Sequence, residues 1–437
     1  MERSRILADI DHKGFLDEYS DVIHGSSLIE AFQDGRIGED DIALLFSIDG
    51  AQLYAKKASA CWIYIWVLLN LSPARHYKKR HVFIGGFILG PNNPKNTDSF
   101  LFPGLQHLAG LQKERLNIWD AALQRKIQSK IFLALLTADG PGMMHVTGLV
   151  GYHGKYGCRL YCGMPGRREV HGKQYFSTLL RPKNYDVDGC MHADIDIRHL
   201  PSPSRDQYNS NLRYLVTSPN ETQYCARHLA TGISKPSIFS GLDLDRSSTL
   251  GLPYSAGSDI MHLAALNLSD LMISLWRGTM NCTKPDDKST WSWVVLRGEM
   301  WQRHGKAVAD TLHYLLSSFD RPPCNIVEKL TSGYKAWEFL LYLYGLCPGL
   351  LYGVIPDAFY SNFCKLVFGI HLMNQHRITV DNVRDAHQAL LSFAQEFELV
   401  YCQRLPTRIH FVRPCIHSLV HLPHEVVRIG LPICSSQ

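Results

Sequence analysis

Two aspartates, Asp49 and Asp139, each follow directly on an apolar run that predicts a buried strand. The two runs cover residues 42–48 and 130–138. A carboxylate at such a strand end is costly unless a cation meets it, and Mg²⁺ prefers one or two carboxylates with water or phosphate at its other positions. The pair therefore predicts a divalent-metal site. The alternative is that both are turn residues, because each precedes a glycine and Asp-Gly favours hairpin turns.

A second group of candidate ligands lies further along the chain. Cys158 and Cys162 are followed by Cys190 and His192, which makes two close pairs of soft ligands. Structural zinc sites use such Cys₃His sets, and a segment rich in loops would gain folding free energy from the metal. These four residues therefore predict a structural zinc site. The alternative is a group of buried free cysteines.

Histidines are also frequent near the C-terminus, where His417 and His421 stand four positions apart. A zinc protease would place Glu directly after the first histidine of such a pair, but Ser418 follows here. We therefore expect His417 and His421 to be core or interface residues.

An acid and an imidazole occur three positions apart at Asp259 and His262, which places them on neighbouring surfaces of one helical turn. The functional interpretation is a pair that lines a catalytic site. The alternative is an acid favoured by the helix dipole at the N-terminal end of a helix, with a satisfied histidine behind it.

Basic residues alternate with aromatic ones in two segments. The first contains Lys78, Lys79 and Arg80, and the second begins at Arg167 and Arg168. Cationic side chains can neutralise phosphates while neighbouring rings stack on unpaired bases, so both segments are candidate DNA-binding sites. The alternative for each is a solvated hairpin tip.

The elements that must position the two acids follow from the hydrophobic pattern. Strands are expected at 42–48, 61–69, 81–89 and 130–138, with an amphipathic helix near 99–113 before the last of them. Short loops between the first three strands imply an antiparallel meander. Three antiparallel strands, a crossover helix and a fourth strand form the front half of a ribonuclease H-like α/β domain. In that fold the two acids would lie side by side.

Composition changes along the chain suggest four parts. Residues 1–40 lead into the first half of the catalytic domain at 41–140, and 141–250 are a loop-rich segment with many Cys and His residues. From 251 to 437 the pattern is mostly α-helical. Its expected apolar faces are formed by Ile260, Leu263, Ala264, Leu271 and Leu275, and by Val383, Ala386, Leu390, Phe393 and Phe397.

The overall composition excludes few classes of function. The chain has 437 residues, is 46% hydrophobic and carries a formal charge of +5, which permits a nucleic-acid partner without requiring one. The longest apolar stretch, near residues 60–71, is too short to span a bilayer, so we expect no membrane partner. Twelve scattered cysteines beside 21 histidines favour thiols or metal ligands in a reducing compartment over a disulfide framework.

Several motifs together resemble those of fungal CACTA-type transposases and the related Kyakuja-Dileera-Zisupton elements. The resemblance extends over nearly the whole chain. It is carried by FSIDGAQLY (46–54), GPNNPKN (90–96), GKYGCRLYC (154–162), GSDIMHL (257–263), SGYKAWEF (332–339) and HFVRPC (410–415).

The resemblance implies a DDE-type transposase that uses two Mg²⁺ or Mn²⁺ ions to cleave and transfer DNA strands. Asp49 would be its first acid and Asp139 its second, while Asp259 and His262 match an acid-x-x-His motif. Transposon-end DNA would be the partner, the nucleus the compartment and a homo-oligomer the candidate assembly.

The chain departs from the family pattern in two places. Three residues separate Cys158 from Cys162 where the family has two, and the family's third acid belongs to a Glu-Arg motif expected beyond Gln437. Glu425 is the nearest candidate for the third acid within this sequence. The cysteine spacing weakens the zinc prediction, whereas the missing third acid and an N-terminus that begins close to the first strand suggest an incomplete copy. The alternatives are a non-catalytic remnant that binds DNA or another protein, and a metal-dependent ribonuclease H-like nuclease unrelated to transposition.

Overall fold

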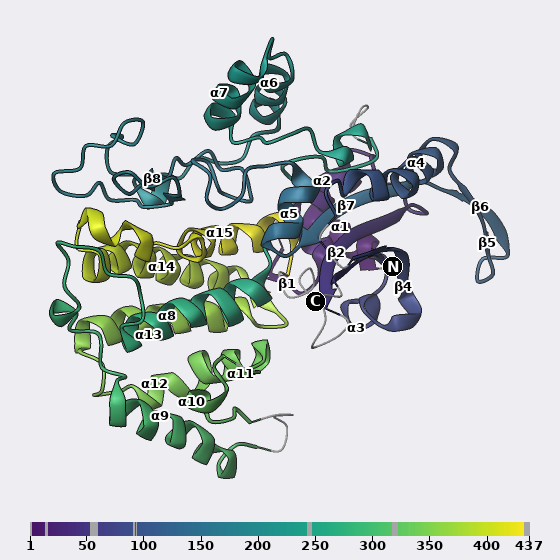
Figure 1. The fold of residues 1–437 in the computed structure, drawn as a ribbon. Coiled ribbons are helices and arrows are strands. Elements are labelled where there is room, and N and C mark those ends of the chain that lie inside the picture. The colour runs from purple at the N-terminus through teal and green to yellow at the C-terminus, as the bar shows by residue number, and fades with distance from the viewer. Residues whose placement is uncertain are drawn as a thin grey trace.

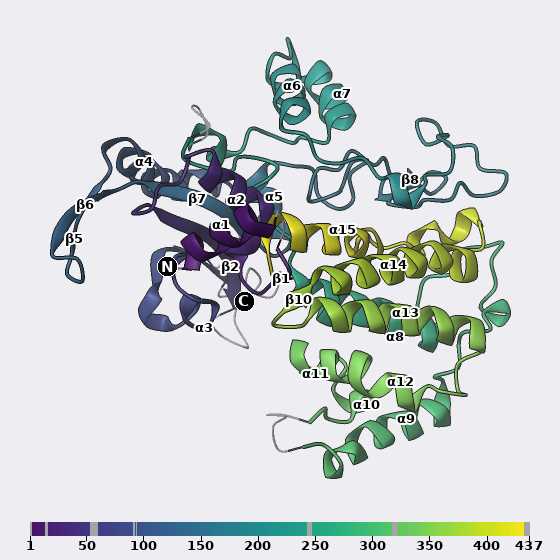
Figure 2. The same cartoon turned by 180° about the vertical axis from the view of Figure 1, so that it is seen from behind.

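The computed structural model describes residues 2–13, 16–52, 60–90, 92, 94–242, 247–316, 322–331 and 333–431. A sheet with its covering helices lies beside a mostly helical part, and a long irregular segment runs along one side of the helical part (Figure 1). The view from behind shows α1 (Glu2–Lys13) and α2 (Ser26–Gln33) against the sheet (Figure 2). The predicted mixed α/β class with a mostly helical C-terminal region is confirmed.

The central sheet has the strand order β4-β3-β2-β7. Its members are β2 (Ile42–Gln52), β3 (Ala60–Leu68), β4 (Val82–Leu89) and β7 (Ile131–Ala138), close to the predicted ranges. β3 pairs antiparallel with both β2 and β4, whereas β7 runs parallel to β2. The C-terminal ends of β2 and β7 therefore lie at the same edge of the sheet.

Side chains that alternate along β2 enter two separate cores. Phe46 packs in one core with Leu101 and Leu105 of α4 (Asp98–Glu114), whereas Leu45 belongs to the core on the other face. This is the period of two that a pleated strand imposes. Every residue of β7 is buried, because this strand is covered on both faces, as parallel strands usually are.

The chain between α4 and β7 forms a hairpin that the sequence pattern did not predict. Its strands are β5 (Leu116–Asp120) and β6 (Arg125–Ser129). The hairpin extends away from the sheet in Figure 1, and its two strands are largely exposed or half-buried. A strand pair without a buried face has little apolar alternation to reveal it.

The segment at 141–250 is less loop-dominated than expected, because it contains α6 (Arg205–Val216) and α7 (Glu221–Thr231). The side chains of Ser204 and Asn220 accept hydrogen bonds from the first turns of these helices and so cap them. Few side chains of either helix are buried, so hydrophobic periodicity gave no indication of them. The rest of this segment is irregular, with β8 (Arg167–Arg168) and β9 (Tyr175–Phe176) as its short strands.

The C-terminal part packs its helices around one large apolar core, and the predicted apolar faces lie in it. None of the described helices combines the length and apolar character needed to cross a membrane. The helices of this part are α8 (Ser269–Arg277), α9 (Gly298–Asp310), α10 (Ile326–Lys329), α11 (Ala336–Leu340), α12 (Cys347–Leu350), α13 (Asp357–Met373), α14 (Val380–Phe397) and α15 (Pro414–Ile429). Three π-helical segments, η5 (Met261–Leu268), η8 (Leu341–Leu346) and η9 (Glu398–Cys402), belong to the same part.

Several contacts among the described residues join the N-terminal and helical parts, and two of them involve whole elements. β1 (Glu18–Tyr19) pairs antiparallel with β10 (Ile378–Thr379), and α15 packs against α2. Gly25 permits the second contact, because a Cβ at this position would come within 2.5 Å of the backbone carbonyl carbon of Ile429. The last helix is thereby held against the sheet domain (Figure 2).

Candidate functional site

The structure brings Asp49 and Asp139 together at one edge of the sheet. Ile48 of β2 pairs with Ala138 of β7 in the parallel register, and each aspartate is the next residue of its chain segment. Adjacent strands are about 4.8 Å apart, so both carboxylates leave the same end of neighbouring strands. Asp49 is exposed and Asp139 is half-buried.

Each of these carboxylates uses one oxygen to order its own backbone. Oδ1 of Asp49 accepts a hydrogen bond from the Gly50 amide at 2.8 Å, and Oδ1 of Asp139 accepts one from the Gly142 amide at 2.6 Å. Asp139 is thus the N-cap of α5 (Gly140–Thr147). Among the described residues, no hydrogen bond occupies Oδ2 of either aspartate. Neither aspartate is the hairpin-turn residue that the alternative expected, because Asp49 lies inside β2 and Asp139 caps a helix. One oxygen of each side chain is left for a ligand.

Asp259 and His262 adjoin the same sheet edge, at the start of η5. Oδ2 of Asp259 lies 2.5 Å from Nδ1 of His262, and Oδ1 accepts a hydrogen bond from the His262 amide at 3.0 Å. Asp259 is buried, whereas His262 is one-third exposed. Asp259 thus caps a helical turn, as the alternative interpretation expected. The pair also lines a cavity, and its role in a catalytic site stays a prediction.

The electrostatics link these four side chains. Exclusion of water by the surrounding protein raises the pKa of Asp49, and the charges of Asp139 and Asp259 raise it further, while His262 opposes them. The hydrogen bond that Asp259 accepts from His262 raises the pKa of this imidazole against the effect of burial, and the charges of Asp259, Asp139 and Asp49 raise it further. Such an excess of negative charge is what a cation would relieve.

Glu425 takes up a different position from the one expected of a third catalytic acid. Its Oε1 accepts hydrogen bonds from Arg428 at 2.8 and 2.5 Å, and its Oε2 accepts one from the Ser258 amide at 3.0 Å. Only 2% of its surface is exposed, and it is not among the described residues that line the cavity. Glu425 therefore fixes the backbone next to Asp259 and has no oxygen left over for a substrate.

Arg159 is a site residue that the sequence analysis missed. Its Nη2 donates to the carbonyl of Ala138, the residue before Asp139, at 3.1 Å, while its buried Nε has no hydrogen-bond partner among the described residues. Burial lowers the pKa of this guanidinium, and the charge of Asp259 counteracts that effect most strongly. The nearest sequence indication was its position beside Cys158.

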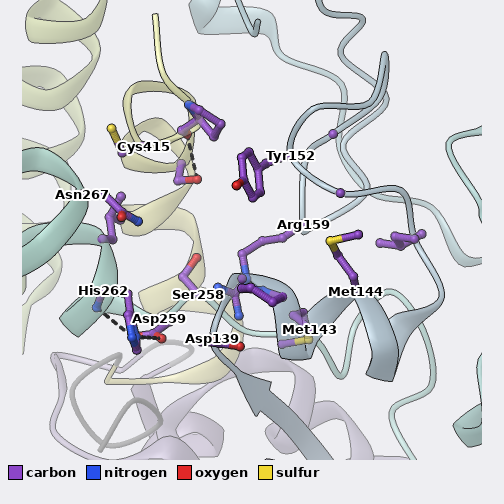
Figure 3. A pocket seen from close by; sticks show the side chains of 18 of the residues that line it. Asp139, Met143, Met144, Tyr152, Arg159, Ser258, Asp259, His262, Asn267 and Cys415 are labelled. Atoms are coloured by element: carbon purple, nitrogen blue, oxygen red, sulfur yellow. Dashed lines mark hydrogen bonds and ion pairs between the residues drawn. The ribbon is translucent and has the colours of Figure 1, made fainter. Parts of the chain in front are cut away.

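A cavity of about 380 Å³ opens beside the acids. Asp139, Asp259 and His262 line one end of it, and Figure 3 shows Tyr152, Arg159 and Asn267 reaching it from different segments. Apolar side chains such as Met143 and Leu263 form much of the remaining wall. A largely apolar cavity with a few convergent polar groups is typical of a small-ligand site.

A buried cluster of Cys158, Cys162, His417 and His421 lies behind this site. Their potential ligand atoms all fall within 4.8 Å of one another. The Cys162 Sγ is 3.4 Å from His417 Nε2, the Cys158 Sγ is 3.7 Å from His421 Nε2, and the two Nε2 atoms are 3.0 Å apart. Ligand atoms of a tetrahedral zinc site are separated by about 3.3–3.8 Å. These four residues could hold a structural metal ion.

The pKa shifts within the cluster also favour binding of a metal ion. The hydrogen bond with Cys162 lowers the pKa of the Cys158 thiol well below its usual value, whereas the same interaction and burial raise that of Cys162. Burial alone would lower the pKa of His421, but the negative charge of Cys158 raises it. Metals bind the thiolate form of cysteine, so the lowered pKa of Cys158 favours coordination.

The predicted ligand set was therefore half wrong. Cys190 lies in a separate apolar cluster with Tyr185 and Val187, and both Cys190 and His192 offer their carbonyl oxygens to Arg167 at 2.8 Å. The interpretation of His417 and His421 as core or interface histidines missed that both face the cysteine pair. Proximity in the sequence misled the assignment, because the true partners come from α15, more than 250 positions away.

The two predicted DNA-binding segments differ in exposure. Lys78, Lys79 and Arg80 are exposed, but they lie between the end of β3 and the start of β4, at the opposite end of the sheet from Asp49. Arg167 is fully buried and donates to backbone carbonyls, so the prediction that it binds DNA is wrong. Its neighbour Arg168 is half-buried and donates to the carbonyl of Gly172 at 3.2 Å.

Comparisons with family models and with curated proteins found no match to this chain. No relative therefore supplies a function. What can be inferred about activity depends on the geometry of the acid site and on the motifs quoted above.

Proposed function

We propose that this chain is the catalytic domain of a DDE-type transposase, which cleaves and transfers DNA strands with the help of divalent metal ions. The observation that supports this proposal is the placement of Asp49 and Asp139 directly after Ile48 and Ala138, the last paired residues of the parallel strands β2 and β7. The sheet order also supports the proposal, because two antiparallel pairings, a crossover helix and one parallel pairing are what we expect of a ribonuclease H-like domain.

The two aspartates fit Mg²⁺ or Mn²⁺ chemically. Both offer hard oxygen donors, and one oxygen of each is left by the described hydrogen bonds. We propose that Asp49 and Asp139 hold the divalent ions. Bound there, such ions activate the attacking oxygen and stabilise the leaving oxygen of a phosphodiester.

Asp259 is a better candidate for a third carboxylate than Glu425. Asp259 lines the cavity beside the acids and its charge acts on the pKa of Asp49, whereas Glu425 is not among the described residues that line this cavity. We propose that Asp259 adds negative charge to the ion site and holds His262 by its Nδ1. Nε2 of His262 is then the ring nitrogen that remains to meet a DNA phosphate.

We further propose that the ion held by Cys158, Cys162, His417 and His421 is structural zinc. Two thiols and two imidazoles form one of the usual ligand sets of structural zinc, and full burial leaves no open position for chemistry. Such an ion would tie α15 to the irregular segment that carries Arg159.

A nicking assay on supercoiled plasmid tests the catalytic proposal. The intact chain should nick DNA in Mg²⁺ or Mn²⁺, and Asp49→Asn or Asp139→Asn should reduce the rate by at least about a hundredfold. Asp310→Asn is the matched control, because Asp310 is an exposed acid on α9 whose described partner is Lys306. Nicking that survives in Asp139→Asn would refute the catalytic assignment, and absence of nicking in every metal would favour a non-catalytic DNA- or protein-binding remnant.

A further inference from the structure

The cavity beside the acids has a polar end and an apolar end. Asp139, Asp259 and His262 lie at the polar end, whereas Met144 and Tyr152 lie on the side of α5 and the loop that follows it. Its volume of about 380 Å³ is at the lower end of the range for small-ligand sites. A single nucleotide is about as large as this cavity. A DNA double helix is too wide to enter it, since its major groove alone is about 12 Å across.

We propose that this cavity receives one unpaired nucleobase of the DNA strand whose phosphate lies at the acids. The inference rests on the proposed function, because it places the scissile phosphate at Asp49 and Asp139. It adds that the substrate must present an unpaired base at this point, either in single-stranded DNA or flipped out of a duplex.

Tyr152 supplies the surface on which a base can stack. Its side chain reaches the cavity from the loop after α5 (Figure 3) and is 46% exposed. The ring packs against His153 with 4.0 Å between ring centroids, which limits its movement. The thioether of Met144 is part of the same wall, and it occupies the space that a Cβ on Gly151 would need. Aromatic and apolar side chains of this kind hold a base by its face.

Asn267 supplies a group that can meet the edge of a base. It lies on η5 and is exposed to the cavity, and no described residue forms a hydrogen bond with its amide. An amide both donates and accepts, as base edges do. Two other polar side chains of the lining are engaged, since Arg413 pairs with Asp270 and Ser418 donates to the Pro414 carbonyl.

Arg159 lies between the proposed base and the acids. Its guanidinium donates to the Ala138 carbonyl, one residue from Asp139, and no residue in the described part of the chain forms a hydrogen bond with its buried Nε. A phosphate oxygen is the ligand that such a donor prefers. Base, sugar-phosphate and ion site would then follow one another along a single cavity, in the order of the groups of a nucleotide.

Binding of fluorescein-labelled DNA, followed by anisotropy in Ca²⁺, tests this inference without requiring cleavage. The probes are a 15-nucleotide oligo-dT strand and the same strand in a blunt duplex with oligo-dA. The intact chain should bind the single strand more tightly, and Tyr152→Ala should weaken that binding about tenfold, the range expected for loss of one stacked base. Tyr152→Phe should restore it, and Asn267→Ala should weaken it by a smaller factor.

Tyr314→Ala is the matched control, because Tyr314 is 87% exposed and lies beyond α9 in the helical part. Equal affinity for both probes, or binding by a folded Tyr152→Ala variant equal to that of Tyr314→Ala, would overturn the inference. The nicking assay separates this result from failure of the proposed function. Loss of nicking in Asp139→Asn with binding unaffected by Tyr152→Ala would refute only the base pocket, and base-dependent binding without nicking would refute only the catalysis.

Discussion

The acid site and the cysteine-histidine cluster are neighbours in space but are built in opposite ways. Asp49 and Asp139 lie at a solvent-facing sheet edge, and the register of two strands alone brings them together. The cluster is fully buried, and its two halves come from a loop and from α15. The first site depends on local strand patterns, whereas the second depends on how two segments far apart in the sequence pack.

This difference predicts different consequences of substitution. An exposed acid pair concentrates like charge, so its loss should affect ligand binding more than folding. A buried metal cluster cross-links distant segments, so its loss should affect folding first. α15 allows a sharp comparison, because it carries both the histidines of the cluster and Glu425.

The largest effect should follow removal of the metal. Cys162→Ala or His417→Ala should abolish stoichiometric zinc, measured by mass spectrometry of the purified protein, and should unfold the region around α15. Structural zinc contributes about 10–16 kcal/mol in zinc-finger peptides, more than the usual stability of a domain. Cys190→Ala and His192→Ala are the controls and should retain full zinc. Zinc loss in those controls, with retention in His417→Ala, would restore the ligand set predicted from sequence.

A smaller effect on stability is expected at Glu425. Glu425→Gln removes the negative charge that pairs with Arg428, so the largely buried guanidinium is left without a charged partner. This should lower the free energy of unfolding by about 3–5 kcal/mol. Chemical denaturation measures this change, with zinc content monitored in parallel. Asp139→Asn should change stability much less, since its second oxygen has no described partner. Equal stability of Glu425→Gln and the intact chain would show that Glu425 is not a structural residue.

The smallest effect concerns the protonation of His262. Because Asp259 stabilises the imidazolium, the pKa of His262 should lie above its ordinary value of about 6.5, and Asp259→Asn should lower it. The stability gained from this interaction should be fully present below the unfolded-state pKa and lost as the pH rises through the folded-state value. An NMR titration of the His262 ring checks both statements. An unchanged pKa in Asp259→Asn would remove the electrostatic link between the two residues.

The sequence revealed the acid site better than the cluster for a physical reason. The strands before Asp49 and Asp139 carry their own apolar pattern, and the parallel pairing then follows from the order of strands and crossover helix. Nothing local in the sequence indicates that Cys158 meets His421, because that contact depends on tertiary packing across 263 positions. Arg167 shows the same limit, since a basic residue in an irregular segment gives no sign that backbone carbonyls will surround it.

The hydrophobic pattern of the sequence also failed to predict two polar helices. α6 and α7 are ordered by caps such as Ser204 and Asn220 and by few buried side chains, so their sequences contain little periodicity. The helices of the large core were predictable. Residues such as Leu271 on α8 and Leu390 on α14 belong to apolar repeats at helical spacing, and both are fully buried. Predictability thus followed the amount of apolar surface that each element buries.

Binding of Mn²⁺, measured by electron paramagnetic resonance on zinc-loaded protein, tests the central claim most directly. We expect the intact chain to bind Mn²⁺ and the Asp49→Asn, Asp139→Asn double variant to lose that binding, while Asp310→Asn binds normally and all proteins keep their zinc. Mn²⁺ binding that is unchanged in the folded double variant would contradict the proposal that the two strand-end aspartates share a divalent cation.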